Sequence, residues 1–182
     1  MRKCEYKTRF LALSIALALA CQAPQSKVAD RYPHYAAQVK RVSRARIQVI
    51  DGDTFRVGEL RIRVLGLDSP EIGSPRHGYF EDQPYGREAR AEAVRIIGQA
   101  SLIEYLPFRN DKHGRLLAHV FVDGELFAVK MIGASLAYET VSFYGDNGFY
   151  DLAREIRRAA DRSAPPPFIQ PHLWRKTHRS KR

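Results

Sequence analysis

Residues 47–71 have the pattern of three short β-strands, and the acidic residues that follow the first and the third constrain the fold more than any other feature. In residues 60–64, apolar side chains alternate with Arg61 and Arg63, which is the period of a half-buried strand. The mostly apolar residues 47–50 lead to Asp51-Gly52-Asp53, residues 54–57 form the strand between, and the alternating segment leads to Asp68-Ser69-Pro70-Glu71. Adjacent antiparallel strands would bring these carboxylates together beside an arginine. Carboxylates next to a permanently charged guanidinium indicate a site for a metal ion and a phosphate rather than a core.

Each of these motifs has an ordinary structural explanation when it is taken alone. Asp-Gly between two apolar segments is a common hairpin turn, and Ser-Pro-Glu is a common loop or helix start. The combination is more specific, because Asp51-Gly52-Asp53-Thr54 is followed by Arg63, then by Asp68-Ser69-Pro70-Glu71, and later by Asp111-Lys112-His113-Gly114-Arg115.

With these motifs the chain resembles the staphylococcal nuclease-like, or thermonuclease, family. Four family motifs occur in the family's order: Asp51–Thr54, Arg63 with Asp68–Glu71, Tyr85–Ala89, and Asp111–Arg115. The resemblance covers roughly residues 43–163. It implies an α+β, mainly β fold: a five-stranded OB-fold barrel with about three helices. Composition and periodicity alone do not fix this topology, although OB barrels often bind oligonucleotides on one face.

The remaining secondary structure follows from apolar spacing and from glycine and proline positions. Residues 72–84 are rich in Gly, Pro and polar side chains and are expected to form a loop beside the acidic cluster. Ala89, Ala93, Val94 and Ile97 give the helix that begins at Tyr85 its expected apolar face. Further segments are predicted as strands at 102–106 and 117–122 and as helices at 127–135 and 149–160.

The N-terminus has the pattern of an export signal. Basic residues precede an apolar run at residues 10–20 that is too short to span a bilayer, and Ala18-Leu19-Ala20 is a small-residue cleavage site. Residues 1–20 are therefore predicted to be a signal peptide. Cleavage would leave Cys21 first, either as a lipid anchor or as a free thiol. Residues 21–42 are expected to be a tether, and the product to be secreted, periplasmic or membrane-anchored as a lipoprotein.

The chain is strongly basic, with a formal net charge of +10, and residues 1–20 account for +3 of it. The remaining excess favours polyanionic partners, although a solvated basic surface would give the same count. Residues 164–182 form a basic C-terminal tail. We expect this tail to be a disordered, solvated terminus; the alternative is that it follows phosphates, with Trp174 stacking on a base.

The candidate site residues match the needs of phosphodiester hydrolysis. A cation must polarise the phosphoryl oxygen, a base must take a proton from water, and fixed positive charge must stabilise the developing dianion. The resemblance assigns a calcium ion to Asp53, Asp68 and the Ser69 carbonyl, and the general base to Glu71; a helix-capping role is the alternative for Glu71. Arg63 and Arg115 would clamp the phosphate through bidentate hydrogen bonds.

Other residues have weaker assignments. The family pattern gives Lys112 and His113 a role in substrate binding, although the family has tyrosine where His113 stands. Phe143 and Tyr144 could stack on bases or pack in the core. His119 lies within a predicted strand and is expected to be structural, and the six histidines show no spacing typical of zinc hydrolases.

The resemblance therefore implies an exported, calcium-dependent nuclease that cleaves DNA and RNA, prefers unpaired strands and leaves 3′-phosphate ends. No obligate protein partner is predicted. Two alternatives remain: a non-catalytic OB-fold module that binds nucleic acid, and a surface-anchored structural lipoprotein. The presence of Arg63, Glu71 and Arg115 together with Asp53 and Asp68 argues against loss of catalysis.

Overall fold

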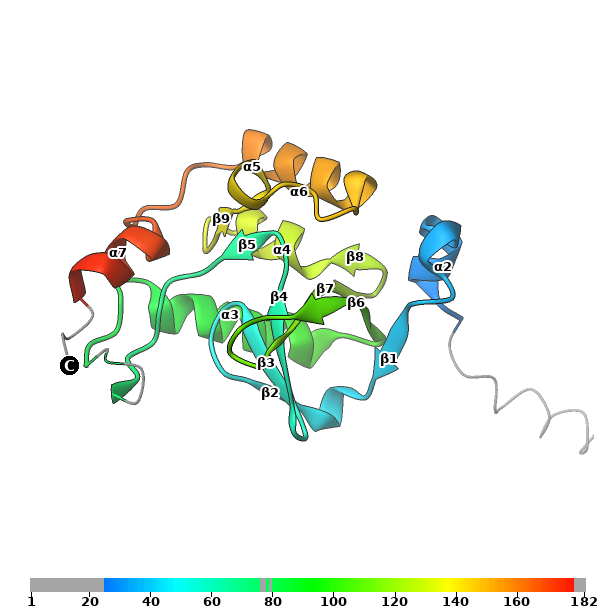
Figure 1. Cartoon of the computed structure of the whole chain (residues 1–182), viewed down its shortest axis with the longest axis horizontal. Helices are drawn as coiled ribbons and strands as arrows, with labels where there is room; N and C mark the ends of the chain where they lie inside the picture. The colour runs from blue at the N-terminus through cyan, green and yellow to red at the C-terminus, as the bar shows by residue number, and fades with distance from the viewer. Residues whose placement is uncertain (1–24, 76–77, 79, 179–182) are drawn as a thin grey trace, which may run out of the picture.

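The computed structural model describes residues 25–75, 78 and 80–178, and in these ranges the chain folds around one curled sheet (Figure 1). The sheet has seven strands in the order β1-β6-β7-β4-β3-β2, with β8 paired to β7. The strands are β1 (Lys40–Val42), β2 (Ile47–Val49), β3 (Thr54–Val57), β4 (Leu60–Val64), β6 (Ile103–Asn110), β7 (Leu116–Val122) and β8 (Glu125–Leu126). A separate two-stranded sheet pairs β5 (Leu67–Asp68) with β9 (Tyr138–Glu139).

The β3–β4 hairpin is the centre of the fold. Its turn is tight because Gly58 has a φ of 60°, a backbone conformation that favours glycine. The hairpin places Thr54 opposite Arg63, and β4 then continues the sheet by pairing parallel to β7. The result is a mixed α+β structure with a curled, half-barrel sheet, which confirms the predicted fold class.

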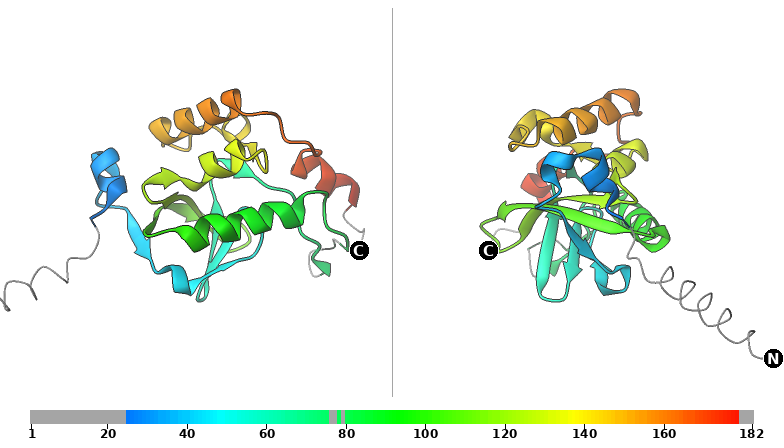
Figure 2. Two further views of the ribbon diagram at one scale, coloured as in Figure 1. Left: turned by 180° about the vertical axis from the view of Figure 1, so that it is seen from behind. Right: turned by 90° about the vertical axis from the view of Figure 1, so that its right-hand side faces the viewer.

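Helices cover the sheet on two sides, as both views in Figure 2 show. Their bounds are α3 (Gly86–Gln99), α4 (Phe127–Gly133), α5 (Val141–Tyr144) and α6 (Tyr150–Arg162). The three longer helices were predicted, with boundaries that differ by a few residues. The apolar face of α3 was predicted incompletely, because Ile96 is buried whereas Val94 is 46% exposed. An apolar residue on the outer side of a helix is common and needs no partner.

The expected tether is instead part of the folded domain. Residues 27–31 form helix α2, a 3-10 helix η2 (Pro33–Tyr35) follows it, and β1 pairs with β6; a second 3-10 helix, η3 (Arg44–Arg46), leads into β2. Val28, Tyr32 and Tyr35 are buried in the main hydrophobic core. The segment looks like a tether in sequence because only these few apolar side chains anchor it. Residues 1–24, and with them the predicted signal peptide and Cys21, lie outside the described residues.

The C-terminal segment also differs from the expected solvated terminus. Residues 171–178 form helix α7, which Figure 1 shows in red at the end of the molecule opposite α2. Trp174 is only 4% exposed and its ring stacks on the ring of His178. It therefore does not lie free on the surface to stack on a base. Among the described residues, no helix has the length and apolar character needed to cross a membrane.

His119 is a core residue, as predicted. It lies in β7, is 3% exposed, and its ring makes an edge-to-face contact with Phe149 at 5.0 Å between ring centres. Its Nδ1 is buried with no hydrogen-bond partner among the described residues. Burial lowers the pKa of His119 to about 3, so the imidazole stays neutral in the folded protein.

We expect His119→Leu to reduce the sensitivity of the fold to acid. Below about pH 6.5 the unfolded chain binds a proton at His119 and the folded protein does not, so protonation favours unfolding. This histidine should therefore lower the free energy of unfolding by up to about 1.4 kcal/mol per pH unit as pH falls from about 6.5 towards 3. Urea unfolding of both proteins between pH 7.5 and 4.5 measures the effect. Parallel stability curves for the two proteins would contradict it.

Candidate active site

The β3–β4 hairpin brings the predicted acids and arginine together. Asp53 directly precedes β3, and its carbonyl oxygen accepts a hydrogen bond of 2.9 Å from the N–H of Val64. Arg63 faces it from β4 and donates to Asp53 Oδ1 through Nη1, and to Asp68 Oδ1 through Nη2 at 2.6 Å. One guanidinium therefore bridges two carboxylates that come from different strands.

Asp53 is held in its ionised form. It is 1% exposed, and its Oδ2 accepts a 2.9 Å hydrogen bond from the N–H of Ser69 while Oδ1 accepts one from the Thr54 hydroxyl at 3.0 Å. Burial alone would raise the pKa of Asp53, but Arg63 and these hydrogen bonds outweigh it, and the pKa lies below its usual value. Burial alone would lower the pKa of Arg63, but the charges of Asp53, Asp68 and Asp51 outweigh it and raise the pKa.

The turn before β3 is pressed against the Asp68–Ser69 segment. A Cβ at Gly52 would lie 2.7 Å from the Cβ of Ser69, so this close approach requires glycine. Asp51 accepts a 3.0 Å hydrogen bond from the N–H of Asp53. Burial and the neighbouring Asp53 raise the pKa of Asp51 well above its usual value. Asp51 therefore shapes the turn, whereas Asp53 carries the negative charge.

Glu71 is positioned by the start of α3. Its N–H donates to Gln83 Oε1 at 3.2 Å, and its carbonyl oxygen accepts from the Gln83 N–H at 2.9 Å. Gly86 packs so closely on this backbone that a Cβ there would lie 2.4 Å from the Glu71 carbonyl oxygen. Burial and the charge of Asp53 raise the pKa of Glu71, although Arg175 and Arg63 oppose the shift. A raised pKa suits a carboxylate that must accept a proton near neutral pH.

Arg115 lies apart from this carboxylate cluster. Its Nε donates to Asp111 Oδ2 at 2.8 Å, and its N–H donates to Asp111 Oδ1 at 2.9 Å. Among the described residues it makes no hydrogen bond to Asp53, Asp68 or Glu71. It precedes Leu116, which pairs with Ile62 in β4, so its backbone lies next to the strand that carries Arg63. No hydrogen bond joins its Nη groups to another of the described residues.

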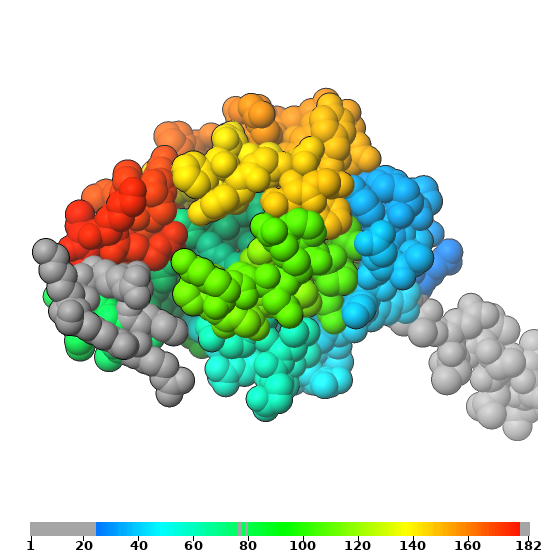
Figure 3. All heavy atoms as spheres, in the orientation of Figure 1, coloured from blue at the N-terminus to red at the C-terminus, as the bar shows by residue number. Residues whose placement is uncertain are grey.

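The predicted substrate-binding residues are accessible. Lys112 and His113 are exposed on the turn between β6 and β7. Phe143 and Tyr144 are 76% and 66% exposed, which excludes the alternative that they pack in the core. Figure 3 shows a hollow in the face of the molecule that is turned to the viewer, bordered by the red C-terminal segment, the yellow segment that includes α5, and the green β6–β7 hairpin.

Arg175 is a site contact that the sequence reasoning missed. From α7, its Nη2 donates to Asp68 Oδ2 at 2.9 Å, and its Nη1 donates to Asp68 Oδ1 at 3.2 Å and to Glu71 Oε1. The only sequence signal was the basic character of the tail. It could not be assigned to this position because more than 100 residues separate Arg175 from both carboxylates.

The predicted ligand set suits calcium by its chemistry. Calcium binds hard oxygen ligands from carboxylates, carbonyls and water, and Asp53, Asp68 and the Ser69 carbonyl are of these kinds. The buried Ser69 Oγ has no hydrogen-bond partner among the described residues and offers another oxygen at the same place. In the described part of the chain, no three Asp, Glu, His or Cys side chains cluster tightly enough to hold a metal ion by themselves. Water and backbone oxygens would have to complete the shell.

Several known proteins are similar to this chain in sequence. A family profile described as "Staphylococcal nuclease homologue" matches residues 61–163. A thermonuclease of Staphylococcus hyicus is 36% identical over 133 residues, which cover 70% of this chain and 73% of the relative. A thermonuclease of Staphylococcus intermedius is 34% identical over 59% of this chain and 64% of its own length.

A third relative, the endonuclease YncB of Bacillus subtilis (strain 168), is 34% identical over 130 residues, or 67% of this chain. The match spans 59% of YncB, so this chain covers somewhat under two thirds of two of the three relatives. The matched profile nevertheless extends over more than half of the chain and includes Arg63, Asp68, Glu71 and Arg115. The chain therefore belongs to the staphylococcal nuclease homologue family.

Proposed function

We propose that this protein is an exported, calcium-dependent nuclease that hydrolyses phosphodiester bonds in DNA and RNA, prefers unpaired strands and leaves 3′-phosphate ends. The observation that carries the proposal is the Arg63 guanidinium, fixed between Asp53 and Asp68 with Glu71 beside them. Membership of the family and the names of its thermonuclease and endonuclease members support the nuclease activity.

Two arginines would bind the phosphate that is cleaved. Arg63 uses one N–H on each of two carboxylates and has three further N–H donors for phosphoryl oxygens. Arg115, bound to Asp111 only through Nε and its backbone, presents its Nη groups to the same phosphate. Together they stabilise the negative charge that develops on the equatorial oxygens. A leaving 5′-oxygen on the far side from the attacking water gives the 3′-phosphate product.

Glu71 takes the proton from the attacking water. Its Oε atoms face the Asp68 side of the cluster, as their shared contact with Arg175 shows. Asp53, Asp68 and the Ser69 carbonyl would hold the calcium ion. When bound, calcium polarises a phosphoryl oxygen and offsets the charge of the phosphate. The exposed Lys112 and His113 would contact the substrate outside the reacting centre.

Cleavage of single-stranded DNA by the purified protein tests this function. Cleavage should require calcium and stop with a chelator. Arg63→Lys, Arg115→Lys and Glu71→Gln should each lower kcat by about two to three orders of magnitude, because each removes a preorganised donor or the base. Asp53→Asn and Asp68→Asn should raise the calcium concentration needed for half-maximal rate.

Arg61→Lys is the control for these variants. Arg61 shares the strand face of Arg63 but has no predicted role, and it pairs across the hairpin with Arg56. The kcat of Arg61→Lys should stay near that of the wild type. Circular dichroism checks that every variant folds. Cleavage that persists in chelator, or full activity of Glu71→Gln, would refute the proposed mechanism.

The contact between Gly86 and Glu71 gives a second test of the base. In Gly86→Ala the new Cβ would collide with the Glu71 carbonyl oxygen, so Glu71 or the start of α3 must move. A displacement of about 1 Å in a catalytic group can lower the rate about 100-fold. We expect kcat to fall by that order while the far-UV circular dichroism spectrum is retained.

Gly98→Ala is the matched control in the same helix. A Cβ at Gly98 meets no atom within 4 Å, so the change should leave the rate unaltered. It should also stabilise the fold by about 0.5–1 kcal/mol, because alanine loses less backbone freedom in a helix than glycine. If Gly86→Ala and Gly98→Ala lost activity equally, the contact between residue 86 and Glu71 would not be the cause of the loss.

Export is part of the same proposal and depends on residues 1–20. Their basic start, short apolar run and Ala18-Leu19-Ala20 support removal of the leader. Intact-mass measurement of protein recovered from the envelope and medium of expressing bacteria should give a chain that begins at Cys21. An added acyl mass would favour the lipid anchor over a free thiol, and a chain that keeps Met1 would contradict export.

A further inference from the structure

Helix α7 closes one side of the site although it lies outside the part of the chain that the family profile matches, residues 61–163. Figures 1 and 2 place it beside the loop that follows β5 and near the start of α3. Arg175 points from this helix into the carboxylate cluster, where its side chain is 28% exposed. Its guanidinium contacts both carboxylate oxygens of Asp68 and one carboxylate oxygen of Glu71.

The position of Arg175 is set by the framework of the site. The Tyr138 hydroxyl donates to the Phe168 carbonyl at 2.6 Å, and Tyr138 lies opposite Asp68 in the β5–β9 pair. Gln83 Nε2 donates to the Ile169 carbonyl at 2.6 Å, while Gln83 Oε1 accepts from the N–H of Glu71. The residues that locate Asp68 and Glu71 therefore also locate the start of α7.

The contact places a guanidinium on oxygens that the proposed reaction needs. Asp68 Oδ1 already accepts from Arg63 at 2.6 Å, and Arg175 takes Oδ2 at 2.9 Å. Arg63 alone leaves Oδ2 of Asp68 open, but the two arginines together occupy both oxygens, so a calcium ion would bind Asp68 only by displacing Arg175. Arg175 also occupies Oε1 of Glu71, and its positive charge opposes protonation of that carboxylate. Arg175 and a metal ion are therefore expected to exclude one another.

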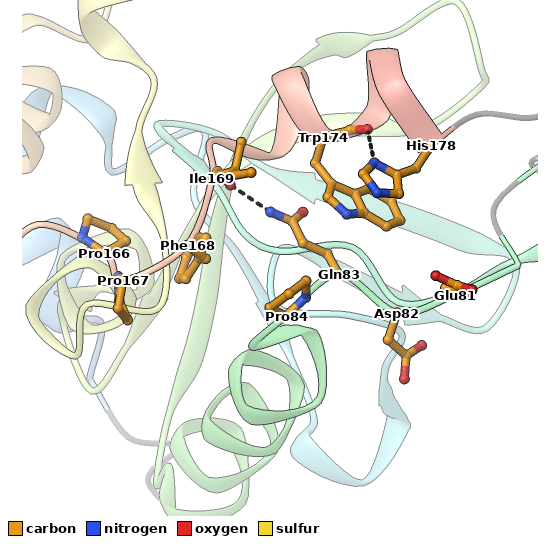
Figure 4. A pocket seen from close by; sticks show the side chains of 10 residues that line it. All are labelled: Glu81, Asp82, Gln83, Pro84, Pro166, Pro167, Phe168, Ile169, Trp174 and His178. Carbon is orange, nitrogen blue, oxygen red and sulfur yellow. Dashed lines mark hydrogen bonds between the residues drawn. The ribbon is translucent and has the colours of Figure 1, made fainter.

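An open groove borders α7 on one side. The groove has a volume of about 660 Å³ and lies beside Trp174, between the loop that precedes α3 and the segment formed by α7 and the residues before it (Figure 4). Glu81, Asp82 and Pro84 line one side of it, and Phe168, Trp174 and His178 line the other.

We propose that α7 is an autoinhibitory latch: Arg175 holds Asp68 and Glu71 in the metal-free protein and leaves them when a divalent cation binds. The inference rests on the proposed function, because it takes Asp68 to be a metal ligand. In the latched state the negative charge of the cluster is neutralised by Arg63 and Arg175. Calcium entry would break the Arg175 contacts, free Glu71 and change the surroundings of Trp174.

Calcium binding by calorimetry, without substrate, tests the latch on the purified chain. Arg175→Gln should bind calcium about tenfold more tightly than the wild type, within the roughly 5–150-fold range of typical coupling between two sites. Lys176→Gln removes the same charge from the next, exposed position of α7 and should bind within about twofold of the wild type. The comparison of the two variants separates the effect of the Arg175 contacts with Asp68 and Glu71 from the effect of losing one positive charge.

Trp174 gives a second readout, because it is the only tryptophan in the chain. Its emission should shift when calcium is added to the wild type, and metal-free Arg175→Gln should already resemble the calcium-bound state. Equal calcium affinity in Arg175→Gln and the wild type, with unchanged emission, would overturn the latch and leave a calcium-dependent nuclease intact. If no form binds calcium and cleavage survives a chelator, both the latch and the proposed function fail.

Discussion

Two aspartates buried side by side need a cation between them, and the structure depends on how Arg63 supplies it. Asp53 and Asp68 are 1% and 6% exposed. An unpaired carboxylate in such surroundings would be strongly disfavoured, and two of them would also repel each other. Arg63 bridges both with separate Nη groups, so the charges are retained without solvent. An ion arrangement of this kind contributes little net stability, but it fixes charged groups at one point.

The surrounding fold keeps Asp53, Arg63 and Asp68 in fixed positions. The register of β3 and β4 sets Arg63 against Thr54, and the Ser69 N–H ties the next strand back to Asp53. Glycines at 52 and 86 allow backbones to approach more closely than a side chain would permit. Glu71 and α7 are then positioned from the same framework through Gln83. A site built on strand ends and tight turns is held more exactly than one built on long loops.

Much of this arrangement was predictable from local motifs. The hairpin and the acids at its ends follow from a two-residue period and turn chemistry. Arg61 and Arg63 share this period, and only the family motif that ends at Asp68 singles out Arg63. The buried, neutral His119 follows from its place in an apolar strand. Two segments were not predictable in the same way. Residues 25–42 and 164–178 have few apolar side chains, and the sequence does not show that Val28, Tyr35 and Trp174 find partners in a core built by distant residues.

The sequence by itself determined the chemical inventory and its local order: which acids end which strands, which strand between them carries arginines, and which glycines allow the turns. These are properties of neighbouring residues, so periodicity and backbone preference are enough to read them. Only the tertiary structure decided that Arg115 is held by Asp111 apart from the cluster, and that Arg175 lies on Asp68 and Glu71. Contacts between residues far apart in the chain depend on how the whole sheet curls and where its last helix docks, and no local pattern encodes that.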